Sequence, residues 1–402
     1  MAWVNGLATG WEILLAIAAT LYAFLSGLLF FECLVALISR QQVQTVESSL
    51  NVSFAILIPA HNEASVIKGT LTQLLPQVDS PEQIVVVADN CHDETAAVAR
   101  STGVKVLERQ DPSRRGKGYA LDYGLHALAN TTPPEVVVMV DADCWVSPGT
   151  IHHIVQAAKQ SGHPIQAVYR MELPPEPSLR DRLSAFAFIV KNRVRAGGLS
   201  QLGVPIMLGG TGMAFPWQAL QSVELASGHI VEDMKLGIDL AISGYISTIS
   251  LESEVLGVLP NDEAAATSQR TRWEHGKLQV LTTYVPRLLS QAIRQLRLDL
   301  FILAVDLAIP PLALWAMIGI SLTAVTSFSM VLGIADTPFL IQIIADILLA
   351  SSILLAWAVW GRKELSFSQL IAVPSYILWK IPLYLKAVIA PQKNWIRTKR
   401  NT

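Results

Sequence analysis

The chain has 402 residues, of which 51% are hydrophobic and only 15% are charged, against roughly 25% in a typical soluble protein. Residues 1–39 hold two charged side chains and residues 298–402 hold thirteen, so 47 of the 62 lie in between. This split excludes an ordinary soluble enzyme and a disordered chain, and predicts an aqueous domain between membrane segments. The net charge of −2 offers no basic surface, so we expect no nucleic-acid partner.

The first apolar segment lies near the N-terminus. Nineteen uncharged residues separate Glu12 from Glu32, and the apolar run resumes to Ile38, which is enough to cross a hydrocarbon core of about 30 Å. A signal peptide would need a basic start and a shorter core, whereas the first basic residue is Arg40. We therefore predict a transmembrane helix within residues 1–40.

Residues 41–297 alternate short strands and helices. Four runs rich in β-branched residues are typical of the buried strands of a parallel sheet: 53–59, 84–88, 104–107 and 136–140. Segments 64–75, 94–101 and 118–129 have helical spacing. This order predicts an α/β fold with an open, mostly parallel sheet and ligands at the carboxyl ends of its strands. Dinucleotide-binding and P-loop sequences are missing, which argues against an oxidoreductase or a P-loop ATPase.

Polar residues follow three of these strands directly: P-A-H-N-E at 59–63, D-N-C-H-D at 89–93 and D-A-D at 141–143. We expect them to share the crevice at one edge of the sheet. Because alternate residues of an extended chain project to the same side, Asp141 and Asp143 could face one hard cation. The alternative interpretation of D-A-D is a strand-to-helix turn with an N-cap aspartate.

The sequence R-R-G-K-G at 114–118 precedes a predicted helix. Glycines let a backbone approach a ligand closely, a helix N-terminus favours anions, and Lys117 adds a point charge, so this segment suits a diphosphate. A solvated basic loop is the alternative. Further along, basic residues alternate with apolar ones over residues 178–199. This pattern predicts an amphipathic helix on anionic lipid or near a lipid-linked acceptor or, equally, a solvated helix of the domain.

Three further motifs complete the middle domain: G-T-G at 210–212 with F-P-W at 215–217, E-D at 232–233 before a predicted helix over 234–242, and Q-R-T-R-W at 269–273. Paired acids at a helix N-terminus can simply complement the helix dipole. Gln269, Arg272 and Trp273 share one face if their segment is helical. Structural alternatives are an arginine stacked on an aromatic ring and a tryptophan at the membrane interface.

Two more apolar segments follow, and we place membrane spans at about 300–335 and 337–361. Pro310 and Pro311 should kink the first of these near its start. The acids Asp299, Asp306 and Asp346 are expected to face the interior of the helix bundle. Residues 366–389 suit a helix lying along the membrane interface, with a re-entrant hairpin as the alternative, before a basic tail.

Loop charges orient these spans, because basic residues are enriched on the cytoplasmic side. Basic residues follow the first span, the third span and the last helix: Arg40, Arg362, Lys363, Lys393, Arg397, Lys399 and Arg400. We therefore expect a multi-pass protein of the bacterial inner membrane with residues 41–297 in the cytoplasm. The unpaired spacing of the three cysteines is typical of a reducing compartment.

In this order and spacing, the motifs P-x-[HN]-N-E, D-N-C-x-D-x-T, R-x-G-K-G, D-A-D, E-D and Q-x-x-R-W resemble inverting glycosyltransferases of family 2. The chain looks most similar to the membrane-embedded synthases of cellulose, hyaluronan and poly-N-acetylglucosamine, over roughly residues 53–290. The resemblance implies a glycosyltransferase A type fold that binds a nucleotide sugar.

The resemblance also implies roles for individual residues. Asp143 would bind a divalent metal, Mg²⁺ or Mn²⁺, and Asp233, beside Glu232, would be the general base. Donor-binding positions would be Glu63, Asp89, Lys117, Asp141, Gln269 and Arg272. Acceptor-binding positions would be Gly210, Thr211, Gly212 and Trp273, with Phe215 and Trp217 beside them.

These observations predict a membrane glycosyltransferase that moves glucose or N-acetylglucosamine from a UDP-sugar to a polysaccharide or glycolipid acceptor. Processive synthesis of a polymer and addition of one sugar to a lipid both remain open. From a different class, the chain could be an inactive nucleotide-sugar-binding component of an export complex. Expected partners are the UDP-sugar, the acceptor, membrane lipid and export or assembly proteins.

Overall fold

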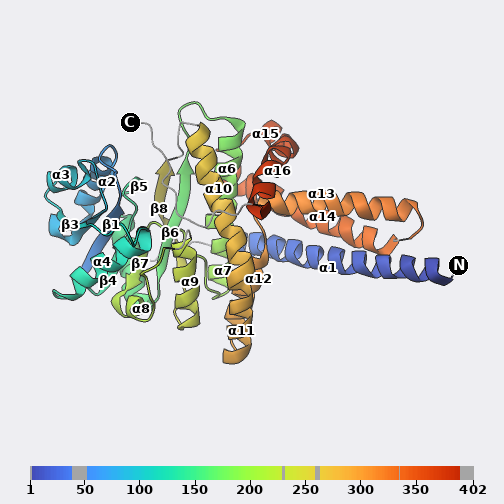
Figure 1. The fold of residues 1–402 in the computed structure, drawn as a ribbon, viewed down its shortest axis with the longest axis horizontal. Helices are drawn as coiled ribbons and strands as arrows, with labels where there is room; N and C mark the ends of the chain where they lie inside the picture. The colour runs from blue at the N-terminus through green and yellow to red at the C-terminus, as the bar shows by residue number, and fades with distance from the viewer. Residues whose placement is uncertain (1, 39–51, 229–230, 259–262, 335, 390–402) are drawn as a thin grey trace.

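A computed structural model describes residues 2–38, 52–228, 231–258, 263–334 and 336–389, and joins an α/β domain to a bundle of long helices (Figure 1). Its strands are β1 Phe54–Ala60, β2 Ile84–Asp89, β3 Lys105–Arg109, β4 Val136–Met139, β5 Cys144–Val146, β6 Ile165–Glu172, β7 Met213–Pro216 and β8 Thr248–Val258. Helices of the α/β domain are α2 Ile67–Leu74, α3 Thr95–Arg100, α4 Lys117–Ala129, α5 Thr150–Ser161, α6 Leu179–Ile189, α7 Ala196–Gln201, α8 Trp217–Gln221 and α9 Glu232–Ile242. The remaining helices are α1 Ala2–Ile38, α10 Glu263–Gln279, α11 Val285–Gln295, α12 Leu298–Ala308, α13 Leu312–Val331, α14 Asp336–Ala356, α15 Phe367–Ile371 and α16 Val373–Ile389.

The sheet has the strand order β3-β2-β1-β4-β7-β6-β8-β5. The four strands predicted from β-branched runs, β1 to β4, are parallel to one another, whereas β7 is antiparallel to both β4 and β6. All six residues of β2 are buried, as expected of a strand covered on both faces. The prediction of an open, mostly parallel sheet is confirmed.

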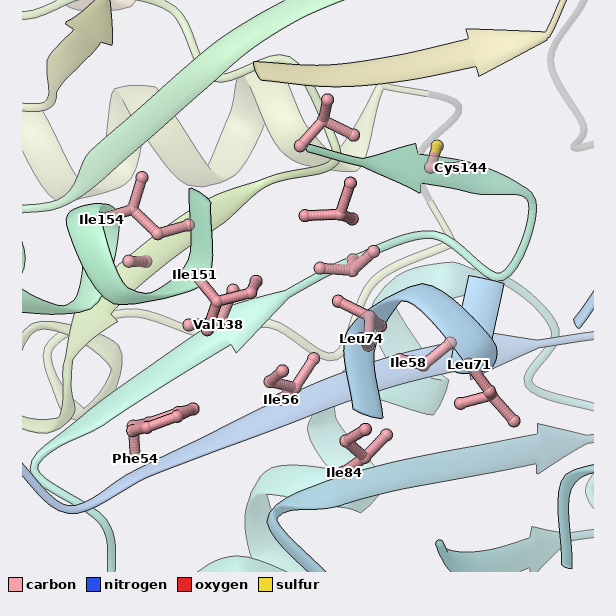
Figure 2. Packing of buried hydrophobic residues seen from close by; sticks show 14 of the residues in the cluster. Phe54, Ile56, Ile58, Leu71, Leu74, Ile84, Val138, Cys144, Ile151 and Ile154 are labelled. Carbon is pink, nitrogen blue, oxygen red and sulfur yellow. The ribbon is translucent and has the colours of Figure 1, made fainter. Parts of the chain in front are cut away.

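Two apolar layers cover this sheet. On one face Ile56 and Ile58 pack with Leu71 of α2 and Ile151 of α5, as Figure 2 shows. Leu57, the residue between the two isoleucines, points to the opposite layer with α4, α8 and α9. This alternation fixes the register of β1, because a slip of one residue would exchange the two faces. The polar residues that follow the strands are therefore held at a defined edge.

Three helical segments are long and apolar enough to cross a membrane: Leu7–Ile38, Leu312–Val331 and Asp336–Gly361. They run side by side, and the N-terminal end of α1 lies near the connection between α13 and α14, far from the sheet (Figure 1). Arg362 and Lys363 consequently lie at the end of the bundle nearest the sheet. Arg40 and the basic residues after 392 lie outside the described residues. Which side of the membrane holds the α/β domain stays a prediction.

The expected span at about 300–335 is wrong at its start, because the chain breaks rather than kinks at the two prolines. In a continuous helix the N–H groups of residues 310 and 311 would donate to the carbonyls of Asp306 and Leu307, and proline has no N–H. Instead, Arg195 donates to the Asp306 carbonyl at 2.9 Å and Lys277 to the Leu307 carbonyl at 3.2 Å. Arg195 and Lys277 of α10 thus satisfy the two carbonyl groups at the end of α12.

The acidic side chains Asp299, Asp306 and Asp346 each have a polar partner. Asp346 accepts hydrogen bonds from the Thr323 hydroxyl at 2.5 Å and from Gln342 at 3.0 Å. Asp306 pairs with Arg195, which agrees with the expectation that this acid faces the interior. Asp299 pairs instead with Arg297, at the start of α12.

The segment 178–199 is neither a lipid-surface helix nor a solvated one. α6 continues through a π-helical turn, Val190–Arg195, into α7, and the segment packs between the sheet and α1. Gly198 allows the close approach, since a Cβ there would lie 2.4 Å from the carbonyl oxygen of Glu32. Arg195 forms ion pairs with Glu32 and Asp306, which explains why a charged residue is found in this layer.

Residues 366–389 form the short α15 and the longer α16. α16 contacts α10, α6 and α13, with Tyr376 and Lys380 buried and Leu378 and Leu385 exposed. Such a two-sided helix fits the predicted interfacial position. Whether it lies on a membrane surface or forms part of a re-entrant hairpin stays a prediction.

Candidate active site

A cavity of about 1040 Å³ begins at the carboxyl ends of β1, β2 and β4 and reaches the membrane helices. Eleven of the thirteen predicted site residues line it: Glu63, Asp89, Lys117, Asp141, Asp143, Gly210, Glu232, Asp233, Gln269, Arg272 and Trp273. Segments that are far apart in the sequence, from Glu63 to Trp273, therefore converge on one volume.

Two asparagines turn the chain away from the sheet at this edge. Asn62 and Asn90 follow β1 and β2 and have φ values of 55° and 50°, a left-handed conformation that asparagine tolerates better than most residues. Each side-chain oxygen accepts a backbone N–H: that of His92 at 2.7 Å for Asn62, and that of Asp111 at 2.8 Å for Asn90. These bonds hold the polar loops over the cavity.

The D-A-D motif brings two carboxylates together, but by a different route from the one expected. Residues 141–143 form a turn, not an extended strand end, and the Cys144 N–H faces the Asp141 carbonyl at 3.4 Å. Ligand atoms of Asp141, Asp143 and Cys144 nevertheless all lie within 4.8 Å of one another. Burial raises the pKa of the Cys144 thiol, so the thiol stays protonated and the carboxylates remain the better ligands. Two carboxylates suit a hard cation such as Mg²⁺ or Mn²⁺.

Lys117 connects this pair to the opposite wall. Its ammonium group forms an ion pair with Asp141 and donates to the Gly210 carbonyl at 2.6 Å. Burial alone would lower the pKa of Lys117, but Asp141 and Glu232 outweigh burial, so the pKa is raised and the group stays charged. Asp141 is consequently held between the metal-binding edge and this lysine.

Gly210 makes room for the adjacent acids. It has a φ of 93°, and a Cβ there would lie 3.1 Å from Asp233 Oδ2 and 3.6 Å from Lys117 Nζ. Asp233 and Glu232 lie in the first turn of α9, where the helix dipole favours negative charge. Burial, followed by repulsion from Asp233, raises the pKa of Glu232 to about 7. Glu232 is therefore partly protonated near neutral pH.

The Q-x-x-R-W residues lie on α10, so the condition for their sharing one face, a helical segment, is met. All three line the cavity, and the buried Gln269 Oε1 has no hydrogen-bond partner among the described residues. Trp273 packs against Phe188 with ring centroids 4.9 Å apart. An unsatisfied carbonyl oxygen facing a cavity is suited to a ligand that donates a hydrogen bond.

Two predicted acceptor residues do not line the cavity. Thr211 is fully buried and its hydroxyl accepts the Asp141 N–H at 3.1 Å, so it positions Asp141 instead. Gly212 has a φ of 66°, and a Cβ there would lie 2.5 Å from Val255, so it is required for packing. Phe215 is likewise a core residue. The turn at 210–212 is thus largely structural, and the neighbouring Gly209 lines the cavity in its place.

Arg109 and Lys191 were not singled out as site residues. Arg109 holds the predicted donor-binding residue Asp89 at 2.6 Å, and both side chains are almost buried. Lys191 lines the cavity with an exposed side chain. Its only signal in the sequence was the excess of basic residues at 178–199, which gave no sign that they face inward.

Comparison with known proteins supports a common origin for this domain. The sequence profile described as "Glycosyltransferase like family 2" matches residues 51–276. The chain is 37% identical over 115 residues to the 4,4'-diaponeurosporenoate glycosyltransferase of Staphylococcus aureus (strain bovine RF122 / ET3-1), a match that covers 27% of this chain and 29% of that protein. The counterpart from strain N315 is 37% identical over 109 residues, which is 26% of this chain and 28% of that protein. The chain thus matches less than a third of the length of these relatives.

A solved structure resembles the fold over most of its length. It is a mannosyltransferase from Pyrobaculum calidifontis in complex with GDP-Man and Mn2+, with a TM-score of 0.51 and 19% sequence identity. The match covers 86% of this chain and 99% of that one, and so extends beyond the α/β domain.

Proposed function

Because this chain belongs to glycosyltransferase family 2, we propose that it transfers a hexose, glucose or N-acetylglucosamine, from a UDP-sugar to an acceptor at the membrane. One observation carries the proposal: three acidic strand ends, the E-D pair and the Q-x-x-R-W face all line one cavity. The acceptor is a polysaccharide or a glycolipid.

The donor occupies the sheet side of the cavity. Glu63 and Asp89 lie where the nucleotide binds, and the fixed Asp89–Arg109 pair supports an oriented carboxylate acceptor for ribose or base groups. Arg272 and Gln269 approach from α10, and a planar guanidinium can bind two diphosphate oxygens at once. The Lys117–Asp141 ion pair lines the same cavity.

Asp143 and Asp141 would hold the divalent metal, since they offer the hard oxygen ligands that Mg²⁺ and Mn²⁺ prefer. The Mn2+ in the archaeal mannosyltransferase supports the same cofactor class for this chain. When bound, the cation supplies charge that stabilises a nucleoside diphosphate leaving group. Lys117 forms an ion pair with Asp141, and we assign the larger share of metal binding to Asp143, as the resemblance to the family implies.

Asp233 is the general base. It takes the proton from an acceptor hydroxyl as the oxygen attacks the anomeric carbon and the bond to the diphosphate breaks, in one displacement that inverts the configuration. Its position at the N-terminus of α9, across Gly210 from Lys117, places it beside the donor carboxylates and in the same cavity as Trp273. We place the protein in a bacterial inner membrane with its α/β domain in the cytoplasm, the compartment in which UDP-sugars are made.

The test uses purified protein in detergent with a panel of UDP-sugars and GDP-mannose, and measures release of the nucleoside diphosphate with Mn²⁺, with Mg²⁺ and with chelator. Asp143→Ala should abolish release, and Asp233→Asn should lower it by about 10²–10⁴-fold, the usual contribution of a general base. Asp79→Asn, at an exposed position, is the matched control. Full activity in both site variants would overturn the assignment, whereas an inactive wild type with bound nucleotide sugar would favour the binding-component alternative.

A further inference from the structure

The cavity has an apolar end that the donor site does not use. Beyond Lys191 and Arg195 it is lined by residues from membrane helices and from α16: Leu29, Ala313, Ala316, Ile353, Val373 and Ile377. Ala316 lies four residues inside α13, or about 6 Å along its axis. Ile353 lies within the last turn of α14. The apolar end therefore lies at the level where these helices leave the α/β domain.

Five polar side chains near this end are already paired with one another. The Ser184 and Tyr376 hydroxyls lie 3.2 Å apart, and Lys380 forms an ion pair with Glu274, which also accepts the Tyr384 hydroxyl at 3.1 Å. A sugar polymer entering here would leave its hydroxyls without partners, at a cost of roughly 1–3 kcal/mol for each buried group. An alkyl or polyene chain needs no such partners and gains free energy from burial.

The break before α13 makes this end continuous with the catalytic groups. The cavity is lined there by the residues that connect α12 to α13: Ile309, Pro310, Pro311 and Leu312, the first residue of α13. The two carbonyls exposed by the break are satisfied by Arg195 and Lys277, so they do not add polarity to the path. Membrane-embedded helices, the break and Asp233 thus border one space.

We propose that the acceptor is a membrane amphiphile whose long apolar chain occupies this end of the cavity while its head-group hydroxyl reaches Asp233. This inference rests on the proposed function and names its acceptor class. The acceptor oxygen forms a bond to the anomeric carbon, the bond from that carbon to the diphosphate breaks with its electron pair on the leaving group, and the proton moves to Asp233. One sugar is added to each acceptor.

The experiment uses the full chain in lipid nanodiscs and a long-chain alcohol that carries a photoactivatable diazirine on its alkyl chain. Labelled residues are mapped by mass spectrometry, and labelling needs no donor. Ala316→Trp fills the apolar end, and Ala324→Trp, exposed on the same helix, is the matched control. Release of nucleoside diphosphate to water without acceptor is measured in parallel and reports on the donor site alone.

We expect labels in the wild type at the start of α13 and on the cavity face of α16. Ala316→Trp should lower this labelling and the transfer of sugar into lipid-extractable product by about tenfold or more, since overpacking costs about 1–3 kcal/mol. Its donor hydrolysis and the behaviour of Ala324→Trp should match the wild type. Labels confined to the outer faces of the bundle, equal labelling in both variants, or a ladder of water-soluble polymer would overturn the inference. If no donor gives release of a nucleoside diphosphate, the proposed function is wrong. The positions of the labels still show whether a long alkyl chain binds at the apolar end of the cavity.

Discussion

The strongest structural prediction concerns Arg195, which joins three parts of the chain far apart in sequence. Its Nε lies 3.0 Å from Glu32 Oε2 on α1, and its guanidinium also pairs with the carboxylate of Asp306 on α12. The side chains of Arg195, Glu32 and Asp306 are 13%, 0% and 7% exposed. Burial would lower the pKa of Arg195, but the two carboxylates outweigh it and raise that pKa. The guanidinium is therefore charged in the folded protein.

Arg195→Ala should leave two carboxylates buried side by side without a counter-charge. Breaking a buried ion pair by removing one partner costs about 3–5 kcal/mol. Because a large chain loses about 2 °C of melting temperature per kcal/mol, we expect a decrease of about 6–10 °C. A triple variant, Arg195→Met with Glu32→Leu and Asp306→Leu, should recover most of this loss, since replacing a whole buried network with apolar groups is often neutral.

Scanning fluorimetry in one detergent measures all of these proteins. Arg294→Ala, an exposed arginine on α11, is the control and should stay within about 1 °C of the wild type, as surface substitutions usually do. The reasoning is refuted if Arg195→Ala melts with the control, or if the triple variant is no more stable than the single one.

Three further predictions follow from particular groups at the site. Since the pKa of Glu232 is raised to about 7, turnover should fall as the pH drops below 7 and Glu232 takes up a proton. Glu232→Gln should move this acid limb of kcat/KM to lower pH, and an unchanged limb would contradict the prediction. Burial lowers the pKa of Lys277 from 10.5 to about 7, so between these pH values only the unfolded state binds the proton and the stability of the folded state rises with pH. The melting temperature of the wild type should therefore rise relative to that of Lys277→Met from pH 7 to 10. Melting temperatures that change in parallel with pH in the two proteins would contradict this prediction. A Cβ at Gly118 would lie 2.6 Å from two backbone carbonyl oxygens, so Gly118→Ala should destabilise by about 1–3 kcal/mol, whereas Gly69→Ala, with open space around it, should be neutral or stabilising in the same denaturation assay.

The sheet and most of the site could be predicted because their signals are local. β-Branched runs mark β1 to β4, and the polar residues that line the cavity follow those strands directly, so topology alone brings Glu63, Asp89 and Asp143 together. Residue spacing likewise placed Gln269, Arg272 and Trp273 on one helix.

What could not be predicted depends on partners distant in sequence. Arg195 looked like a surface cation because its partners lie 163 and 111 residues away. Thr211 looked like an acceptor residue, since nothing near it in the sequence shows that its hydroxyl is committed to the Asp141 N–H. The helix break at Pro310 could be foreseen as a kink, but not the arginine and lysine that make a full break possible.

That break has a consequence for how the two halves of the molecule can be exchanged between relatives. The donors that satisfy the carbonyls at the end of α12 come from the segment before α7 and from α10, and one of them, Arg195, also pairs with Glu32 of α1. A chimera that exchanged the membrane bundle alone would separate these donors from the broken helix that they complete, and would separate Arg195 from Glu32. The junction between the two halves is therefore a poor place to recombine.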